Sequence, residues 1–461
     1  MARRAADVGG AAVAGSPRPV PGAALPGVPP DPDAFPRFFL TGIAATLSAG
    51  ATWGAIVLLR IAAHRSLTSV SIFEINAHAQ AQIYGWVGMF VMGFAYTAFP
   101  RFWRVRLRWP GAVLASWLLM AAGVVLRALG EPLHQARGLA PAAITGATAQ
   151  LAAVAVLAAV LLATRRGSSA RLTVSDRYIA AAVGWFVAAG AVDVFHVARM
   201  VGAATAAGVV RQVEVWQFPL RDLQIHGLAM MMIFGVSSRQ FPAWFGTPVP
   251  DAGRARRLWL PLQLAVALET ASFAIGMGTG RHLWLAASGV AALALAVCAV
   301  AFVANEHLWA RVERPDRSLK FVRAAQVWLV VALAMLVLAP AYFAVMGTHF
   351  SHAWYGAMRH AITVGFISLT IMGVAARVVS AHAAPWAPDV GRLRLPFALV
   401  NIGCALRVTT QVAVDFTAAA FPVAGASGVL EVAGLAVWGA RLARAMLARR
   451  RAVAVEGGTH A

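Results

Sequence analysis

Three histidines stand at or near the start of long apolar segments. His78 opens "HAQAQIYGWVGMFVMGFAYTAFP", His226 lies in "IHGLAMMMIFGV", and His360 opens "HAITVGFISLTIMGVAARVVS". Ionisable side chains inside apolar segments are costly and usually functional. Neutral imidazole is the commonest biological metal ligand and an axial ligand of haem iron. These three histidines are therefore the first candidates for residues that bind a cofactor and ligate its metal.

The segments that carry these histidines have the composition of membrane spans. The chain is 60% hydrophobic and 12% charged, with a mean hydropathy of +0.70. Soluble domains carry about 25% charged residues, and a bilayer-crossing helix needs about 20 apolar residues. We therefore predict an all-α polytopic membrane protein with about twelve transmembrane helices. The predicted spans are 38–60, 77–100, 111–130, 141–164, 179–199, 222–243, 258–279, 283–303, 324–346, 357–380, 396–416 and 422–444.

The basic charge predicts how the protein is oriented in the bilayer. The net charge is +21, and most Lys and Arg fall in the two tails and in alternate loops. This pattern is the positive-inside rule, so we predict cytoplasmic termini and no nucleic-acid partner. The predicted organisation is a disordered cytoplasmic tail (1–37), a transmembrane domain (38–447) and a basic cytoplasmic tail (448–461).

The three histidine-bearing spans resemble one another. The stretches "VMGFAYTAFP" (91–100), "IFGVSSRQFP" (233–242) and "IMGVAARVVS" (371–380) each place Gly after two bulky residues and end at the predicted inner face. They belong to the second, sixth and tenth spans, which are separated by equal numbers of helices. This spacing indicates three four-helix units around a pseudo-threefold axis.

The glycines below His78 have two explanations. With α-helical spacing, His78, Gln82, Gly85 and Gly93 fall near one face. Glycines there would let a flat macrocycle approach the backbone, or they would allow close packing between helices. The spacing alone does not separate these explanations, and we take room for a macrocycle as the working interpretation.

The remaining polar groups are weaker candidates. Most of the 12 histidines fall on the predicted outer side, which favours a metal or haem site near that surface. A single histidine at a wet interface is more often solvated than ligating. Glu269 and Glu431 lie inside predicted spans, where a proton relay or a structural polar contact would explain a carboxyl group. The weaker metal candidates are His196, His349, His352 and His382.

Two stretches resemble a known family. "HAQAQIYGWVG" (78–88) is similar to the second helix of haem–copper oxidase subunit I, where a histidine seven residues before Gly-Trp binds a haem. "GFAYTAFPRFW" (93–103) and "RHAITVGFISLTIMGVAARVVSAH" (359–382) resemble the NnrS family more specifically. Members of that family are twelve-span membrane proteins that contain haem and copper and are linked to nitric oxide metabolism.

The resemblance implies a function and a set of site residues. It implies a haem-binding protein of the bacterial inner membrane, with His78 and His360 as axial ligands of haem b. His226 would ligate a second haem or a metal. Arg359 and Arg221 would pair with haem propionates. Copper is implied by the family, but Gln80 and Ala81 stand where its motif has a histidine and a glutamate.

The implied ligand is nitric oxide or another small diatomic molecule, and the role lies in nitrosative stress or nitrogen-oxide respiration. The sequence leaves open whether the protein is an oxidoreductase acting on nitric oxide, and it does not identify an electron donor. A secondary transporter and a cofactor-free assembly partner of a respiratory complex are the alternatives. A transporter would usually show a two-fold repeat and interrupted helices near the midplane.

Overall fold

The described part of the chain is entirely helical. The computed structural model describes residues 34–135, 138–313, 316–383 and 393–458, and these residues contain no strand. Eleven of its helical segments are long and apolar enough to cross a membrane. The remaining predicted span, 222–243, lies within a continuous helical stretch from Ala206 to Phe245, which is not among those eleven. Its polar residues, such as Asp222 and His226, are buried against neighbouring helices.

The helices form three successive groups. The first contains α1 (Ala34–Ala45), η1 (Thr46–Gly50), α2 (Ala51–His64), α3 (Ile72–Gln80), η2 (Ala81–Gly88), α4 (Met89–Trp103), α5 (Pro110–Gly130) and α6 (Ala140–Arg166). The second contains α7 (Val174–Val201), α8 (Ala206–Gln212), η3 (Val213–Gln217), α9 (Phe218–Asp222), η4 (Leu223–Met230), α10 (Met231–Phe245), α11 (Ala252–Thr279) and α12 (His282–Asn305). The third contains α13 (Leu319–Val345), α14 (His352–His360), η5 (Ala361–Ser368), α15 (Leu369–Ala383), α16 (Arg394–Ala413), η6 (Ala418–Ala420) and α17 (Phe421–Gly458).

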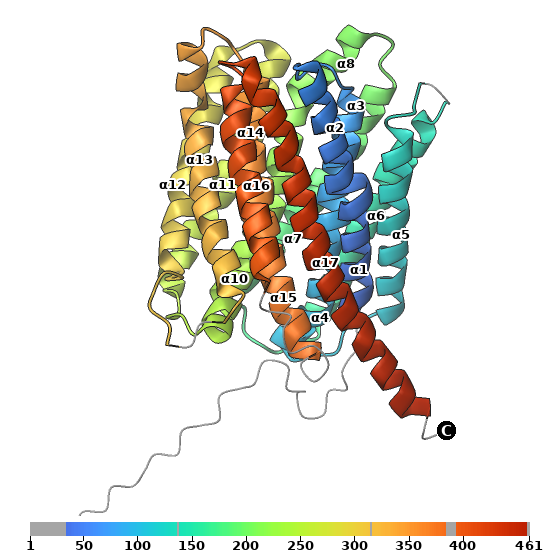
Figure 1. Ribbon diagram of the computed structural model, residues 1–461. Coiled ribbons are helices and arrows are strands. Elements are labelled where there is room, and N and C mark those ends of the chain that lie inside the picture. Colours follow the sequence, from blue (N-terminus) through green and yellow to red (C-terminus); the bar gives the residue numbers. More distant parts are fainter. Residues whose placement is uncertain (1–33, 136–137, 314–315, 384–392, 459–461) are drawn as a thin grey trace, which may run out of the picture.

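The three groups repeat one packing arrangement. In each group the first span packs on the second, as α1 on α4, α7 on α10 and α13 on α15. The third and fourth spans form antiparallel pairs, α5 with α6, α11 with α12 and α16 with α17. Neighbouring groups meet where α6 contacts α7, α12 contacts α13 and α17 contacts α2. The helices therefore stand side by side as one bundle, with long helices on its outside (Figure 1).

The histidine-bearing spans occupy the centre of this bundle. In the segments 72–103 and 352–382, 89% and 72% of the most apolar window is buried, compared with 28% for α13. Trp86 of η2 donates a hydrogen bond to Ser368 of η5 across the centre (3.2 Å). In a bilayer every backbone polar group must be satisfied within the segment, which is why these central elements are helices. The central position lets polar side chains avoid the lipid.

Local sequence sets where some of these helices begin. Ser71 caps α3 by accepting from the amide of Phe73, and Glu74 accepts from the amide of Ser71. Thr173 and Asp176 form the same reciprocal arrangement at the start of α7. Such capping boxes satisfy amides that have no partner in the first turn.

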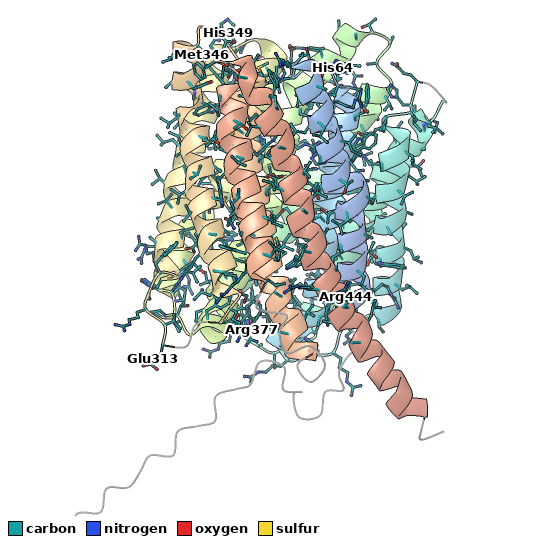
Figure 2. All side chains as sticks on the ribbon, viewed as in Figure 1. His64, Glu313, Met346, His349, Arg377 and Arg444 are labelled. Carbon is teal, nitrogen blue, oxygen red and sulfur yellow. The ribbon has the colours of Figure 1, made fainter. Side chains whose placement is uncertain are left out.

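The two ends of the bundle carry different residues. Figure 2 shows His64, Met346 and His349 at one end, and Arg377 and Arg444 toward the other. This separation agrees with the predicted assignment of outer and inner residues. The helices extend slightly beyond the predicted transmembrane domain (38–447), since α1 begins at Ala34 and α17 continues to Gly458. Most of the predicted 1–37 tail lies outside the described residues.

Each central span contains a π-helical segment at the same place in the repeat. The segments η2, η4 and η5 are each eight residues long, and each is followed by a 15-residue α-helix. Gly85, Gly227 and Gly365 occupy the fifth position of these segments. The register matches the three sequence stretches aligned above. Long π-helical stretches are rare and are frequently found at functional sites.

The predicted face of the second span packs on the first span, which is the continuous helical stretch Ala34–His64. A Cβ on Gly54 would meet the His78 ring, so His78 faces this stretch. A Cβ on Gly85 would lie 2.8 Å from Ala45 Cβ, and one on Gly93 would lie 2.7 Å from Phe38 Cβ. His78 and the two glycines therefore share one face, as helical spacing predicts. The glycines serve close packing on the first span, and the macrocycle interpretation is not supported.

We expect Gly365→Ala to destabilise the protein by about 1–3 kcal/mol, because overpacking forces neighbouring side chains off their preferred positions. The added Cβ would lie 2.4 Å from Cγ of Trp328 on α13. The change is measured by thermal unfolding in detergent, which is monitored as the loss of the monodisperse peak. Gly289→Ala on α12 is the matched control, because nothing lies within 4 Å of its added Cβ. Equal thermal midpoints for the two variants would show that the contact at Gly365 is unimportant.

Candidate haem and metal sites

The first site contains His78 and His360, which come from different central spans. Nδ1 of His78 lies 2.9 Å from the carbonyl oxygen of Gly50, and Nδ1 of His360 lies 2.9 Å from that of Gly356. A carbonyl can only accept, so each Nδ1 carries the proton and each Nε2 keeps its lone pair. Metal-ligating histidines usually donate their second ring nitrogen in this way.

The two rings have polar surroundings. His78 lies within electrostatic range of His360, and Arg407 of α16 interacts with both. His78 and His360 are each half-buried. Arg407 Nε and Nη1 are buried and have no hydrogen-bond partner. The residues therefore fit a cofactor that takes imidazole nitrogen as ligand and carries an anionic group.

The second site is a buried cluster of Asp222, His226 and Glu269. One possible ligand atom from each residue lies within 4.8 Å of the other two. Nδ1 of His226 is 3.1 Å from Oε2 of Glu269 and 3.9 Å from Oδ1 of Asp222. Asp222 and Glu269 have no exposed surface, and His226 is 3% exposed. Two carboxylates and one imidazole at this separation can hold a metal ion.

Arg359 links the second site to the third group of helices. Its Nη2 lies 2.6 Å from Oδ1 of Asp222, and its guanidinium stacks over the rings of Phe218 and Tyr355. Arg221 instead donates hydrogen bonds to Gln224 (2.9 Å) and Asn76 (3.3 Å). Arg221 lies within electrostatic range of His78, and Arg359 precedes His360 in the chain, but both arginines already have polar partners. Their predicted pairing with haem propionates stays a prediction.

A third buried group of charges lies in the first set of helices. Arg127 of α5 forms ion pairs with Glu131 and with Asp193 of α7, and all three are at most 2% exposed. Arg127 also donates to Gln150 (3.3 Å), which donates to Gln80 (2.7 Å). We call Arg127, Glu131 and Asp193 the charged cluster.

The sequence analysis did not identify the charged cluster or Asp222, and it identified Glu269 only as a carboxyl group inside a predicted span. Arg127 and Asp193 each lie inside a predicted span, and a charged residue there is the signal that could have found them. Asp222 stands four residues before His226, on the same helical face, which is a second usable signal. Glu269 was predicted as a proton relay or a structural polar contact, and it lies within the potential metal site. Its relay role stays a prediction.

The weaker histidine candidates do not join the first or second site in the described structure. His196 is buried, and its Nε2 lies 2.9 Å from Oε1 of Gln217. His349 and His352 are exposed near the predicted outer face. His382 packs against Phe35 and has its Nδ1 2.8 Å from the carbonyl oxygen of Val378. Their ligand roles stay predictions.

Glu431 of α17 lies within electrostatic range of Arg407. Its Oε1 is buried without a hydrogen-bond partner, and its Cγ packs where a Cβ on Gly403 would lie 2.8 Å away. Glu431 is therefore a neighbour of the first site, and its proton-relay role stays a prediction.

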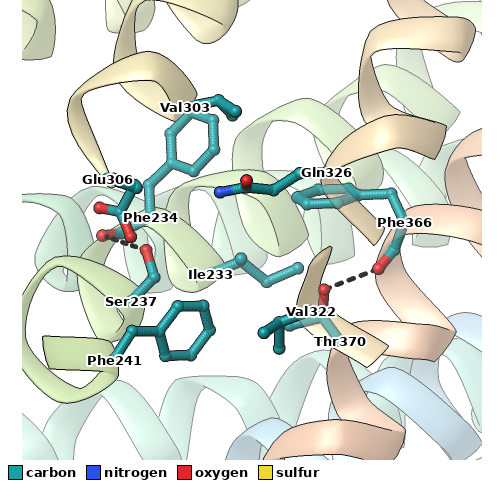
Figure 3. A pocket seen from close by; sticks show the side chains of 10 residues that line it. All are labelled: Ile233, Phe234, Ser237, Phe241, Val303, Glu306, Val322, Gln326, Phe366 and Thr370. Atoms are coloured by element: carbon teal, nitrogen blue, oxygen red, sulfur yellow. Dashed lines mark hydrogen bonds between the residues drawn. The ribbon is translucent and has the colours of Figure 1, made fainter. Parts of the chain in front are cut away.

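A small pocket near the inner end of the bundle contains another buried carboxyl group. Glu306, which follows α12, and Ser237 lie on one side of it, with Gln326 and Phe366 opposite (Figure 3). The pocket has room for about one water molecule. Both carboxyl oxygens of Glu306 lack a hydrogen-bond partner. Burial among apolar side chains raises the pKa of Glu306 to about 8.

This raised pKa predicts how stability changes with pH. An ordinary glutamate has a pKa of 4.5, so between that pH and about 8 the unfolded chain releases a proton that folded Glu306 retains. The stabilisation is therefore complete at low pH and is lost as the pH rises toward 8. We expect Glu306→Gln to match the parent near pH 4.5 and to raise the thermal midpoint by several degrees at pH 8. Parallel pH profiles for the two proteins would contradict this, and Glu214→Gln at an exposed site is the control.

The fold and the buried sites define a class of protein. It is an all-helical polytopic membrane protein with a haem–copper-oxidase-like fold. Among solved structures it is similar to a haem–copper terminal oxidase dimer determined by cryo-EM, with a TM-score of 0.66 over 91% of this chain and 85% of that chain. The sequence identity is 12%, so this likeness concerns the fold alone.

The family follows from the sequence as a whole. The family model described as NnrS protein matches residues 33–451, and the chain belongs to this family. A search of curated proteins finds no match to the chain. The family assignment confirms the resemblance that was based on two spans, and it extends the resemblance over nearly the whole chain.

Proposed function

We propose that His78 and His360 are the axial ligands of a b-type haem in an inner-membrane protein that binds nitric oxide. The observation that carries this proposal is the matched pair of imidazoles, each fixed by a backbone carbonyl and each with Nε2 left as a ligand. Imidazole is an established axial ligand of haem iron. Bound haem would supply one-electron redox chemistry to this site.

Arg407 takes a specific role in this proposal. Two of its nitrogens are buried without a hydrogen-bond partner, Arg407 lies within electrostatic range of both histidines, and a guanidinium pairs well with a carboxylate. Arg407 is therefore the residue that we expect to neutralise a haem propionate, in place of Arg359 and Arg221. Gly54 completes the site because any larger residue there would displace the His78 ring.

The second site supplies the place for a gas ligand. If both axial positions of the haem are filled by histidine, the haem suits electron transfer rather than binding of a diatomic molecule. Asp222, His226 and Glu269 are three protein ligands, which leave coordination positions open on a metal ion. Nitric oxide would bind there, and the family's link with nitric oxide supports this assignment.

Addition of nitric oxide to the reduced, detergent-purified protein tests the function. We expect a saturable change in the EPR spectrum from a nitrosyl complex. A reduced haem protein whose absorption and EPR spectra do not respond to nitric oxide would overturn the gas-binding role. The predicted cytoplasmic position of both termini belongs to the same proposal and is supported by the distribution of basic residues.

A further inference from the structure

We infer that Asp222, His226 and Glu269 hold a non-haem ferrous iron rather than copper. The three residues come from α9, η4 and α11, so two neighbouring spans of the second group build the site. The inference deepens the second site of the proposed function, but it does not depend on haem at the first site.

The cluster has unsatisfied ligand atoms. Both carboxyl oxygens of Asp222 and Oε1 of Glu269 are buried without a hydrogen-bond partner. Oδ1 of Asp222 is ion-paired with Arg359 at 2.6 Å, which leaves Oδ2 of Asp222 and Oε1 of Glu269 without a partner. Buried carboxylate oxygens are normally paired, hydrogen-bonded or bound to a metal. These two oxygens are therefore available as ligands for a cation.

The charges of the site allow a cation to bind. Asp222 and Glu269 contribute two negative charges, and Arg359 contributes one positive charge. A protonated His226, 3.1 Å from Glu269, balances the remaining charge when no metal is bound. A divalent cation would replace that proton, and both carboxylates would stabilise its charge.

The donor atoms select the metal. Copper(I) is selected by cysteine and methionine sulfur, and imidazole-rich sets suit copper(II), whereas carboxylates suit harder ions. The cluster offers one nitrogen and two anionic oxygens, and neither Cys298 nor Cys404 belongs to it. Non-haem ferrous iron is typically held by two histidines and one carboxylate with open positions, and this cluster offers the same donor types as one histidine and two carboxylates. The donor set therefore disagrees with copper as the resident ion.

Neighbouring residues hold the ligands in place. Ser288 of α12 donates a hydrogen bond to the backbone oxygen of Glu269 (2.9 Å), which fixes that turn of α11. Arg359 holds Asp222 from the opposite side. Outer contacts of this kind orient metal ligands and are needed for full affinity. Arg359 is thus a positioning residue for the site.

Elemental analysis tests the inference on the full-length protein purified from cells supplied with iron, copper and zinc. Iron, copper, zinc and manganese are measured per chain, and haem is measured separately as the pyridine haemochrome. We expect total iron to exceed haem iron by about one atom per chain. His226→Ala and Glu269→Gln are expected to lose this excess and to keep the haem. Glu306→Gln changes a buried carboxyl group outside the site and should keep both.

Three results would overturn the inference. Copper, zinc or manganese near one atom per chain that disappears in His226→Ala would show that the site selects another metal. No metal beyond haem iron would show that the cluster is not a metal site, and haem would remain supported. Excess iron that persists in both variants would place it elsewhere. Non-haem iron without haem would support the inference and overturn the proposed haem ligation instead.

Discussion

His78→Ala and His360→Ala are each expected to abolish the haem Soret band of the purified protein. Each change removes one axial nitrogen, and no other histidine joins the pair in the described structure. The backbone contacts at Gly50 and Gly356 fix the two rings, so neighbouring side chains are not placed to replace them. The measurement is the ratio of Soret absorbance to protein absorbance, together with haem content by pyridine haemochrome.

Imidazole rescue separates ligation from folding. In a cavity left by His78→Ala, added imidazole should restore the Soret band because it supplies the missing nitrogen. His282→Ala, at an exposed outer position, is the control and should retain full haem. Full haem occupancy in both alanine variants would show that neither histidine is needed as a ligand.

Arg127→Met is expected to destabilise the protein by about 3–5 kcal/mol, because it leaves two buried carboxylates without their cation. Glu131 and Asp193 are 1% and 2% exposed, and both pair with Arg127. Methionine fills a similar volume, so the loss of charge dominates over the loss of packing. The expected fall in thermal midpoint is about 3–5 °C for a chain of this length, measured in detergent by intrinsic fluorescence and by size-exclusion recovery after heating.

Two further variants show whether charge is the cause. The triple variant Arg127→Met, Glu131→Gln, Asp193→Asn should recover much of the stability, since its buried charges are removed together. Arg211→Met is the surface control, because the Arg211–Glu214 pair is 3.8 Å apart and about half exposed. Such pairs contribute less than about 1 kcal/mol. A thermal midpoint for Arg127→Met equal to that of the control would contradict the importance of the charged cluster.

The fold was largely accessible from the sequence because the bilayer restricts the solutions. Apolar runs such as 111–130 correspond to α5 almost residue for residue, since each run must satisfy its own backbone as a helix. The repeat of 91–100, 233–242 and 371–380 also holds in the structure. It was visible because Gly93, Gly235 and Gly373 meet the same packing requirement in each group.

The shared face of the second span was accessible from helical spacing. His78, Gly85 and Gly93 all pack on the first span, the stretch Ala34–His64. The π segment beginning at Ala81 was not accessible, because no residue in "AQIYGWVG" signals it locally. The role of the two glycines, close packing or room for a macrocycle, also required the three-dimensional structure.

The sites depend on contacts between distant parts of the chain. Asp222 and Glu269 come together across two spans, and Arg127 meets Asp193 through the packing of α5, α6 and α7. The repeat does explain one feature of these sites. Gln80, Asp222 and His360 each precede a π segment, and each contributes to a different buried polar group. One position in the fold thus contributes to three different polar environments.

The absorption spectrum of the detergent-purified protein, oxidised and then reduced with dithionite, tests the haem assignment most directly. Ligation by His78 and His360 predicts a sharp Soret band and a distinct α-band on reduction, as expected for a six-coordinate b-type haem. A flat visible spectrum from protein made in haem-replete cells would contradict the account and would return the transporter and assembly-partner functions to first place.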